Sequence, residues 1–243
     1  MAKLTVEQLV HHYYKSSDYS MLAYKTKVDY SNCLDIMLNT KLNKHSICTT
    51  KVDKLTGAIA RQSYELWLKR GISMANHIVS SSRKVYSFGM EMGYVEYNPF
   101  STFKCKTNKP RKVIWTREQI KKLLDFCYSD FRYRSIGLIV QMSYEWCQRV
   151  GDMRLLKFES IDFNNGVLNL EQSKRGASVS LPISEDLFEM LQEQKRDYDF
   201  QEYVAPVPKA IRSSYNPYTL HRLSIVARKV IKLCGLPDEL RIA

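Results

Sequence analysis

The stretch WCQRVGDMRLLKFESIDFNNGVLNLEQSKRGASVSLPIS spans residues 146–184, and its pattern changes part-way along. Its second half alternates apolar and polar residues over 166–171 and again over 177–182, as half-buried strands do. Between these segments, Ser173-Lys174-Arg175-Gly176 has the composition of a turn. The stretch therefore predicts a small antiparallel β-hairpin.

Helical patterns surround this hairpin on both sides. Thr116-Arg117-Glu118-Gln119 has the form of a capping box, which opens a helix. The apolar run RSIGLIVQMSYEWC predicts a longer helix over 134–147, and residues 184–195 and 218–233 return to helical spacing after the hairpin. The expected fold class is therefore mainly α with a small antiparallel β-hairpin or sheet.

The first hundred residues predict helices alone. Thr5-Val6-Glu7-Gln8 is a further capping box, and we expect later helices over 20–38, 58–69 and 72–93, the last ending at Gly93. The apolar residues expected to face the core from the first and last of these three are Met21, Tyr24, Val28, Leu34, Met37 and Leu38, and Met74, Ile78, Val85, Phe88 and Met92. The aromatic residues expected to pack in the core are Tyr64, Trp67, Tyr86 and Phe88.

Positive charge is concentrated between the two patterns. The chain has 37 basic and 25 acidic side chains, a net charge of +12, which favours a polyanion such as nucleic acid as partner. The segment 101–118, STFKCKTNKPRKVIWTRE, carries all of its basic residues before its first acid. Such a run can be a solvated linker or a phosphate-binding segment, and both interpretations stay open. We expect a helical domain over 1–103, a basic linker over 104–115 and a second domain over 116–243.

The remaining composition argues against metal and membrane functions. The six cysteines form no CxxC pair and the five histidines lack ligand spacing, so reduced structural thiols are expected. No apolar run approaches the roughly 20 residues that span a bilayer, and the start lacks the pattern of a secretory signal. We expect a cytoplasmic protein without cofactor, metal or membrane partner.

Three segments resemble the tyrosine recombinase (phage integrase) family in their order and spacing. Residues 81–100, SSRKVYSFGMEMGYVEYNPF, resemble the last helix of the family's core-binding domain, which ends in A-x-x-x-G-x-I-x-x-N-P. Residues 146–170 resemble the first catalytic box, T-G-x-R-x-x-E-x-x-x-L-x-x-x-D-I-D, and residues 172–184 resemble the hairpin with the catalytic lysine. The resemblance implies an N-terminal SAM-like helical core-binding domain followed by a partial α+β tyrosine-recombinase catalytic domain.

The resemblance also implies site-specific DNA recombination or integration, by phosphodiester transesterification through a phosphotyrosine intermediate. Arg149 stands at the family's first catalytic arginine, Lys174 at the hairpin lysine and Asp152 at an acid that is usually glutamate, while Cys147-Gln148 replaces the usual Thr-Gly. A guanidinium suits a phosphate clamp, a lysine can act as general acid, and Asp152 can hold Arg149 in place. Without the resemblance, the same residues indicate an ordinary surface ion pair and an exposed turn.

The family's His-x-x-Arg box and tyrosine nucleophile have no clear match in the sequence. The tail GLPDELRIA, residues 235–243, resembles the lead-in to that box, with Ala243 at or just before the histidine position. A second register places Asp238 and Arg241 at the His and Arg positions, and the last tyrosine, Tyr218, precedes either register. We therefore expect a truncated chain that is inactive on its own.

Double-stranded DNA is the expected partner, and the resemblance implies a homotetramer on paired sites for a full-length protein in a bacterial or phage-infected cell. The residues expected to contact DNA are Arg83, Lys84, Lys109, Arg111, Lys112, Lys174 and Arg175. Two alternatives stay open: a non-catalytic DNA-binding or regulatory protein with a recombinase-like fold, and a helical protein with a fortuitous motif.

Overall fold

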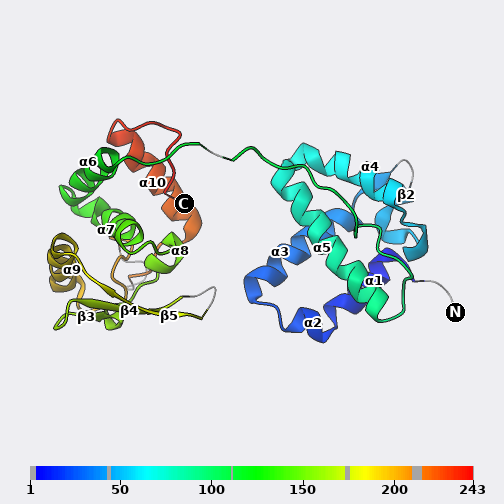
Figure 1. Cartoon of the computed structure of the whole chain (residues 1–243), viewed down its shortest axis with the longest axis horizontal. Coiled ribbons are helices and arrows are strands. Elements are labelled where there is room, and N and C mark those ends of the chain that lie inside the picture. Colours follow the sequence, from blue (N-terminus) through cyan, green and yellow to red (C-terminus); the bar gives the residue numbers. More distant parts are fainter. Residues whose placement is uncertain (1–3, 43–44, 111, 173–175, 210–214, 243) are drawn as a thin grey trace. The chain divides into compact units, whose positions relative to one another are not determined.

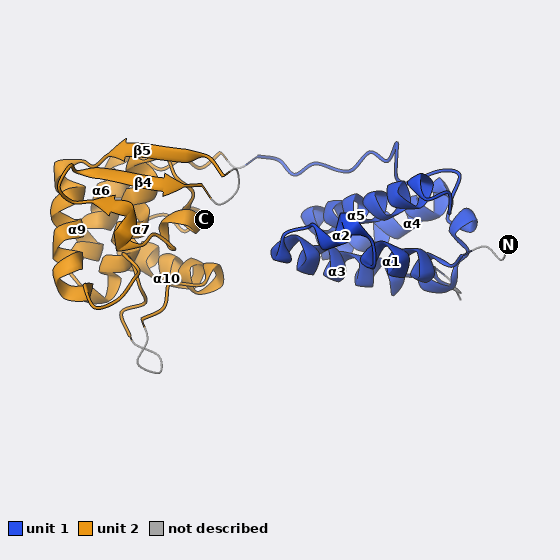
Figure 2. Ribbon diagram, turned by 90° about the horizontal axis from the view of Figure 1, so that it is seen from below, with its two compact units in different colours: residues 1–110 blue, residues 111–243 orange. Residues whose placement is uncertain are grey.

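The structure is a computed structural model that describes residues 4–42, 45–110, 112–172, 176–209 and 215–242. The chain forms two compact units, residues 1–110 and residues 111–243 (Figure 2). The division between them falls inside the basic segment 104–115. In the described ranges, no helix combines the length and the apolar composition that crossing a membrane requires.

Unit 1 is built around its longest helix, α5, which packs against α1, α3 and α4 (Figure 1). The elements of unit 1 are α1 (Val6–Tyr14), α2 (Ser17–Ser20), α3 (Tyr24–Leu38), β1 (Lys41–Leu42), β2 (His45–Ser46), η1 (Ile47–Thr49), η2 (Val52–Lys54), α4 (Gly57–Trp67), η3 (Leu68–Arg70) and α5 (Ile72–Glu91). The capping box expected at Thr5 is present, because Thr5 and Gln8 each accept the other's backbone N–H. The expected stop at Gly93 is also present, with φ at 70°.

The buried face of α5 differs from the expected one by about one residue. It consists of Ala75, Ile78, Val79, Ser81, Ser82, Val85, Tyr86, Phe88 and Gly89. Met74 and Met92, expected in the core, are 39% and 54% exposed. Small residues fill the close contacts between helices here, and an apolar pattern alone does not reveal which stripe the neighbours cover.

The N-terminal half of α3 was also wrongly placed in the core. Leu34 and Met37 are fully buried, as expected, but Met21, Tyr24 and Val28 are 86%, 83% and 40% exposed. Met21 caps the short helix α2 and lies outside α3 altogether. The four expected aromatic core residues, Tyr64, Trp67, Tyr86 and Phe88, are all buried.

After α5 the chain doubles back along unit 1. Arg83 donates hydrogen bonds from Nε to the carbonyl of Phe100, at 2.8 Å, and from its terminal nitrogen to that of Phe103, at 3.2 Å. Asn98 donates to the carbonyl of Arg83 at 2.9 Å. Phe100 is completely buried. This segment therefore belongs to the folded unit.

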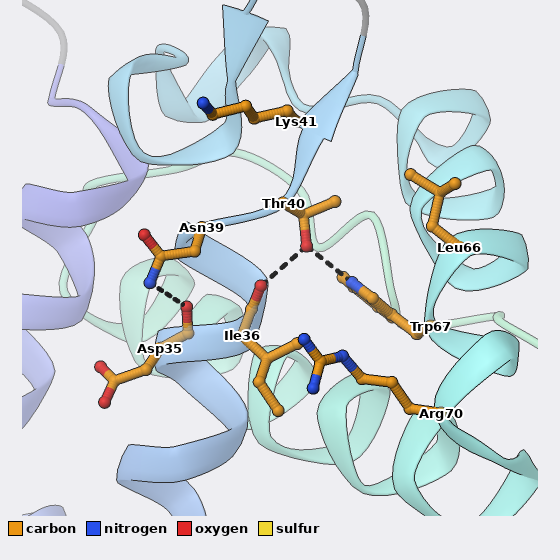
Figure 3. A pocket seen from close by; sticks show the side chains of 8 residues that line it. All are labelled: Asp35, Ile36, Asn39, Thr40, Lys41, Leu66, Trp67 and Arg70. Carbon is orange, nitrogen blue, oxygen red and sulfur yellow. Dashed lines mark hydrogen bonds between the residues drawn. The ribbon is translucent and has the colours of Figure 1, made fainter.

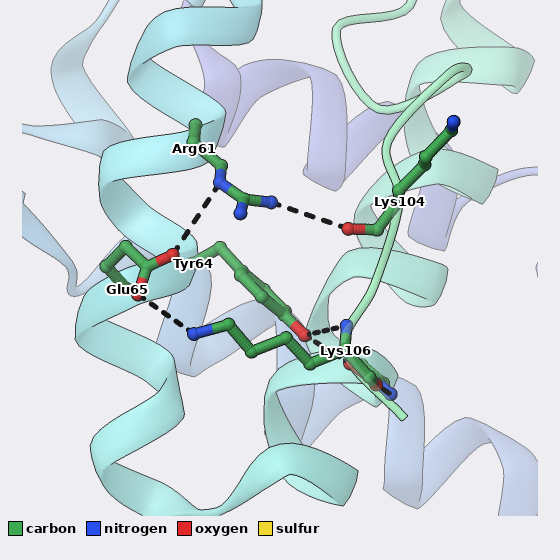
Figure 4. A network of polar contacts seen from close by, with 6 residues as sticks. Arg61, Tyr64, Glu65, Lys104 and Lys106 are labelled. Carbon is green, nitrogen blue, oxygen red and sulfur yellow. Dashed lines mark hydrogen bonds and ion pairs between the residues drawn. The ribbon is translucent and has the colours of Figure 1, made fainter. Parts of the chain in front are cut away.

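Polar contacts continue this docking as far as residue 106 (Figure 4). The Tyr64 hydroxyl accepts the backbone N–H of Lys106 and donates to Oδ1 of Asn76, both at 2.7 Å. The Asn76 amide donates to the Lys106 carbonyl at 2.8 Å, and Arg61 donates to the carbonyl of Lys104 at 3.4 Å. The first part of the expected linker is thus held against α4 and α5.

Unit 2 combines helices with one three-stranded antiparallel sheet. Its elements are α6 (Arg117–Tyr128), α7 (Phe131–Glu145), α8 (Val150–Met153), η4 (Phe158–Ser160), β3 (Ile161–Asp162), β4 (Val167–Glu171), β5 (Ser178–Pro182), α9 (Glu185–Tyr198) and α10 (Leu220–Leu233). The capping box at Thr116 is confirmed, and so is the expected hairpin, which is β4 paired with β5. Strand β3 was not expected; it pairs with β4 in the order β3-β4-β5.

The core of unit 2 lies between α7 and its neighbours. Ile136, Ile139 and Met142 of α7 are fully buried, and Leu168 of β4 packs into the same cluster. The expected fold class, mainly helical with a small antiparallel sheet, is confirmed. All six cysteines lie in the described ranges and none of them forms a disulfide.

Candidate nucleic-acid interface

Arg149 lies at a corner between two helices of unit 2. Helix α7 ends at Glu145, and Arg149 is the N-cap residue of the four-residue helix α8. Its backbone carbonyl accepts the N–H groups of Asp152 and Met153 at 2.9 and 3.0 Å. The guanidinium is 44% exposed. The corner therefore fixes the backbone of Arg149 while its charge stays available to a ligand.

Asp152 lies beneath this guanidinium, as the sequence predicted. The distance from Oδ2 of Asp152 to the terminal nitrogen of Arg149 is 3.5 Å, and the Asp152 side chain is only 6% exposed. This ion pair joins the N-cap residue of α8 to the third residue of that helix. With four residues, α8 is much shorter than the helix that the i, i+3 argument assumed. A buried carboxylate favours a nearby cation, so Asp152 restrains Arg149.

The hairpin is tied to this corner by two side chains. The Gln172 amide donates to Oε1 of Gln148 at 2.8 Å, and the indole of Trp146 donates to the Pro182 carbonyl at 3.1 Å. Gln148 immediately precedes Arg149, and Gln172 immediately follows β4. The hairpin is thus held beside the arginine corner at its loop end, by Gln172, and at its open end, by Pro182.

The segment with the predicted lysine follows Gln172 and precedes Gly176. Lys174 and Arg175 lie outside the described residues, but both ends of their loop are described. Gly176 donates its backbone N–H to the Gln172 carbonyl at 2.8 Å, and Gln172 donates to the Ala177 carbonyl at 2.9 Å. Gly176 has φ at 63°, which a glycine adopts without strain.

The two predicted DNA-contacting residues of α5, Arg83 and Lys84, both have partners within unit 1. Arg83 is bound to the carbonyls that follow α5, and Nζ of Lys84 lies 3.0 Å from Oδ2 of Asp18. This ion pair raises the pKa of Lys84 through its hydrogen bond to the Asp18 carboxylate. Less of their charge is therefore free for DNA than the sequence suggested.

The linker cations are freer than these two residues. Lys109 and Lys112 are exposed, whereas Arg111 lies outside the described residues. On the side of unit 2, the Trp115 indole donates to the Arg241 carbonyl at 2.9 Å, which fixes the end of the linker. Residues 107–114 therefore run between two anchored points, Lys106 and Trp115.

A basic helix surface in unit 2 was missed by the sequence analysis. Helix α10 has no acid, and its exposed cations are Arg222, Arg228, Lys229 and Lys232. The sequence signal was present, because residues 203–237 contain no aspartate or glutamate at all. By contrast, seven acids lie within residues 185–202, the segment that contains α9. In unit 2, the acids of residues 185–202 and the exposed cations of α10 therefore lie on different elements.

Comparison with known proteins identifies the second unit. Residues 114–213 match the family model described as the phage integrase family. This segment is therefore similar to the phage integrase family, that of the tyrosine recombinases. The resemblance inferred from residues 146–184 is thereby confirmed.

The fold of the chain is similar to that of solved integrases. A lambda integrase dimer bound to a COC′ core site aligns with a TM-score of 0.76 and 19% identity over 96% of this chain and 65% of that one. A lambda integrase tetramer bound to a Holliday junction aligns at 0.77 and 18%, over 97% and 68% of the two chains. The Tn1549 transposon integrase in complex with a circular intermediate DNA aligns at 0.74 and 15%, over 99% and 83%.

A curated relative adds a comparison in sequence. The Escherichia coli (strain K12) protein IntQ, which is described as defective, is 24% identical over 196 residues, covering 77% of this chain and 44% of the relative. The chain thus spans less than two thirds of IntQ and of the lambda integrase dimer's chain.

The family's first catalytic box corrects one residue of the sequence interpretation. In T-G-x-R, the glycine lies two residues before the arginine, so its counterpart is Cys147 and not Gln148. Cys147 has φ at 50°. Among the described residues other than glycine, it is the only one with a positive φ. In the left-handed conformation, the Cβ atom of other residues clashes with the backbone, and glycine avoids this clash because it has no Cβ. The family's glycine thus suits this corner on backbone grounds.

Replacing this cysteine by glycine should stabilise unit 2. We expect Cys147→Gly to raise the free energy of unfolding by up to about 1 kcal/mol, because the left-handed strain is relieved. Chemical denaturation measures the change. Cys48→Gly is the matched control: its φ is negative, so that variant should lose stability. A destabilised Cys147→Gly would refute the strain argument.

Proposed function

We propose that the chain binds double-stranded DNA and carries part of the machinery of site-specific recombination by phosphodiester transesterification. The observation that supports this proposal is the hydrogen bond between Gln148, the residue before Arg149, and Gln172, the last described residue before Lys174. In this proposal Arg149 and Lys174 act on one scissile phosphate, whose nonbridging oxygens gain charge in the transition state.

Each residue takes the role that its chemistry supports. Arg149 offers paired planar donors to the phosphate oxygens. Lys174, on a flexible stem, protonates the leaving 5′ oxygen as general acid. Asp152 is buried against Arg149 and orients it without touching DNA. Arg149, Lys174 and Asp152 are therefore the proposed catalytic and positioning set.

Two tyrosines, Tyr215 and Tyr218, lie in the C-terminal part of unit 2, and their surroundings disfavour a role as nucleophile. Tyr218 is 2% exposed, and burial raises its pKa to about 12. The Tyr215 ring packs edge-on against Tyr198 and Phe200, with centroids 5.3 Å away in each case. We therefore propose neither tyrosine as the nucleophile, and we expect the 243 residues to bind DNA without cleaving it.

A gel and anisotropy experiment tests this proposal. Fluorescence anisotropy with a labelled duplex should show binding whose log affinity falls linearly with log salt. A nicked duplex that traps phosphotyrosyl intermediates should give no covalent adduct on a denaturing gel. Absence of binding at low salt would refute the proposed DNA partner, and an adduct would refute the inactive-fragment claim.

A second candidate is a non-catalytic DNA-binding protein with the same fold. The description of IntQ as defective favours this alternative, because the alignment with that relative covers 77% of this chain at 24% identity. The natural reading frame distinguishes the two candidates. A continuation with a His-x-x-Arg box and a tyrosine supports the recombinase, whereas a stop codon after Ala243 supports the regulatory protein. In a full-length recombinase, we also propose assembly as a homotetramer on paired sites.

A further inference from the structure

Aromatic rings from three separate segments of unit 2 gather at the C-terminal end of helix α9. They belong to Phe131, the first residue of α7, to Tyr198, the last residue of α9, and to Phe200 and Tyr215. The rings of Phe131 and Tyr198 stack at 10°, with centroids 5.7 Å apart. The Phe200 centroid lies 6.1 Å from that of Tyr198 and 5.3 Å from that of Tyr215. We refer to these four residues as the aromatic cluster.

The aromatic cluster is open to solvent at its two phenylalanines. Phe200 is 70% exposed and Phe131 is 49% exposed, whereas Tyr198 is buried. Exposed apolar side chains that stand alone are ordinary, but contiguous ones mark surfaces that another molecule covers. Because transfer of their area out of water is favourable, the cluster is a candidate docking surface.

The charge around the aromatic cluster favours a cationic partner. Residues 185–202, which contain α9 and Phe200, hold seven acids and two bases, in a chain whose net charge is +12. Asp197, Asp199 and Glu202 flank Phe200 in the sequence, and all three are exposed. Rings that stack on nucleic-acid bases lie in cationic grooves, so these carboxylates disfavour a nucleic acid. They attract a positively charged protein segment instead.

The chain itself shows how this cluster holds a guanidinium. Arg134 lies 4.6 Å above the centre of the Phe131 ring and also pairs with Asp197. Asp199 and Phe200, adjacent in the chain and both exposed, offer the same combination of carboxylate and ring. Within the part of the chain that the structure describes, no cation lies over the Phe200 ring, and the Asp199 side chain has no hydrogen bond or ion pair. This ring and this carboxylate are therefore available to a guanidinium from another molecule.

Two hollows elsewhere on the protein suit a cationic partner less well. The pocket of unit 1 beside Trp67 is lined by Lys41 and Arg70, against a single acid, Asp35 (Figure 3). The Trp67 ring is also closed to a partner, because it is 2% exposed and its indole donates to the Thr40 hydroxyl at 2.8 Å. A hollow of unit 2 is lined by one acid and by the cations Arg228, Lys229, Lys232 and Arg241. An arginine-bearing partner would meet like charge at both places.

We propose that the aromatic cluster binds an arginine-bearing basic segment of a protein partner, with one guanidinium stacked on Phe200 and paired with Asp199. A guanidinium suits both groups, because its plane stacks on a ring while its N–H donors reach a carboxylate. A lysine ammonium is strongly hydrated and has no such plane. The inference goes beyond the proposed function and does not depend on it, since rings and carboxylates rather than cations form this surface.

Titration of the whole chain with a labelled peptide of three Arg-Gly repeats tests the inference. Fluorescence anisotropy at about 0.1 M salt should show saturable binding, and the matching Lys-Gly peptide should bind about threefold more weakly. Phe200→Ala and Asp199→Asn should each weaken binding of the arginine peptide by about threefold, because each removes one of the two contacts. Phe200→Tyr keeps the ring and should bind the peptide as the wild-type chain does.

Two control variants change similar groups away from the cluster. Ile225→Ala removes an apolar side chain that is 55% exposed on α10. Glu185→Gln removes a charge from the first turn of α9, about 20 Å along the helix from Asp199. Neither should alter the affinity for the arginine peptide. Because the Phe200 side chain is mostly exposed, Phe200→Ala should keep the urea denaturation midpoint of the wild-type chain.

Several results would overturn the inference. These are a lack of saturable binding, equal affinity for the two peptides, and an unchanged affinity in Phe200→Ala. Labelled oligothymidine serves as a further probe. If the chain bound this single strand and Phe200→Ala lost that binding, the rings would stack on bases, and a nucleic acid would replace the proposed protein partner.

Discussion

Replacing Lys109, Arg111 and Lys112 together by alanine should weaken DNA binding on the order of 100-fold at 0.1 M salt. Each phosphate contact contributes about 0.9 to the slope of log affinity against log salt, so the loss of three contacts lowers the slope by about 2.7. Lys109 and Lys112 are exposed, and they lie between Lys106, which is held by unit 1, and Trp115, which is held by unit 2.

The control for this variant removes the same charge from elsewhere. Lys15, Lys25 and Lys54 are exposed lysines of unit 1, and their replacement by alanine leaves an identical net charge. Anisotropy titrations at several salt concentrations compare the two triple variants. Equal losses in both would show that overall charge, rather than contact by the linker, drives binding. No change in the slope of the linker variant would contradict the phosphate contacts outright.

Arg134→Ala should lower the free energy of unfolding by about 2–4 kcal/mol, because a nearly buried side chain is removed from between α7 and α9. The Arg134 side chain is 10% exposed and pairs with Asp197, while its Nε donates to Oε1 of Gln194 at 2.7 Å. Gln194 is completely buried. The guanidinium also lies 4.6 Å above the centre of the Phe131 ring. Removal leaves a buried amide oxygen unsatisfied and opens a cavity between α7 and α9.

Arg132 provides the comparison for this effect. It pairs with Asp130 at 2.6 Å, but its side chain is 77% exposed. An exposed pair gains little over hydration, so Arg132→Ala should leave the urea denaturation midpoint almost unchanged. If Arg134→Ala proved as mild as Arg132→Ala, the α7–α9 contact would not depend on this arginine.

Much of the fold could be predicted because its signals are local. Capping boxes at Thr5 and Thr116 involve residues three apart, and strand alternation over 166–171 and 177–182 depends only on neighbours. Arg149 and Asp152 were paired correctly for the same reason. Ile78, Val85 and Phe88 of the predicted stripe of α5 are buried. Met74 was wrong because it is apolar, whereas the residue that packs is the smaller Ala75.

The features that were not predicted depend on contacts between residues far apart in the sequence. Arg83 was expected at DNA, but its carbonyl partners lie 17 and 20 residues away, and no local pattern reveals them. The bond between Gln148 and Gln172 joins residues 24 apart. Glutamine is common on surfaces, so neither residue attracts notice in the sequence. The basic surface of α10 could have been predicted, because residues 203–237 contain no acid. This signal was overlooked.

A double-mutant cycle on Arg149 and Lys174 tests the central claim most directly. DNA affinity is measured for Arg149→Ala, Lys174→Ala and the double variant at 0.1 M salt. Each single change should weaken binding by about tenfold. If both cations contact one phosphate, as proposed, the double variant should depart from additivity by at least about 0.5 kcal/mol. Strictly additive losses, or no loss for either residue, would contradict a shared site beside the Gln148–Gln172 bond.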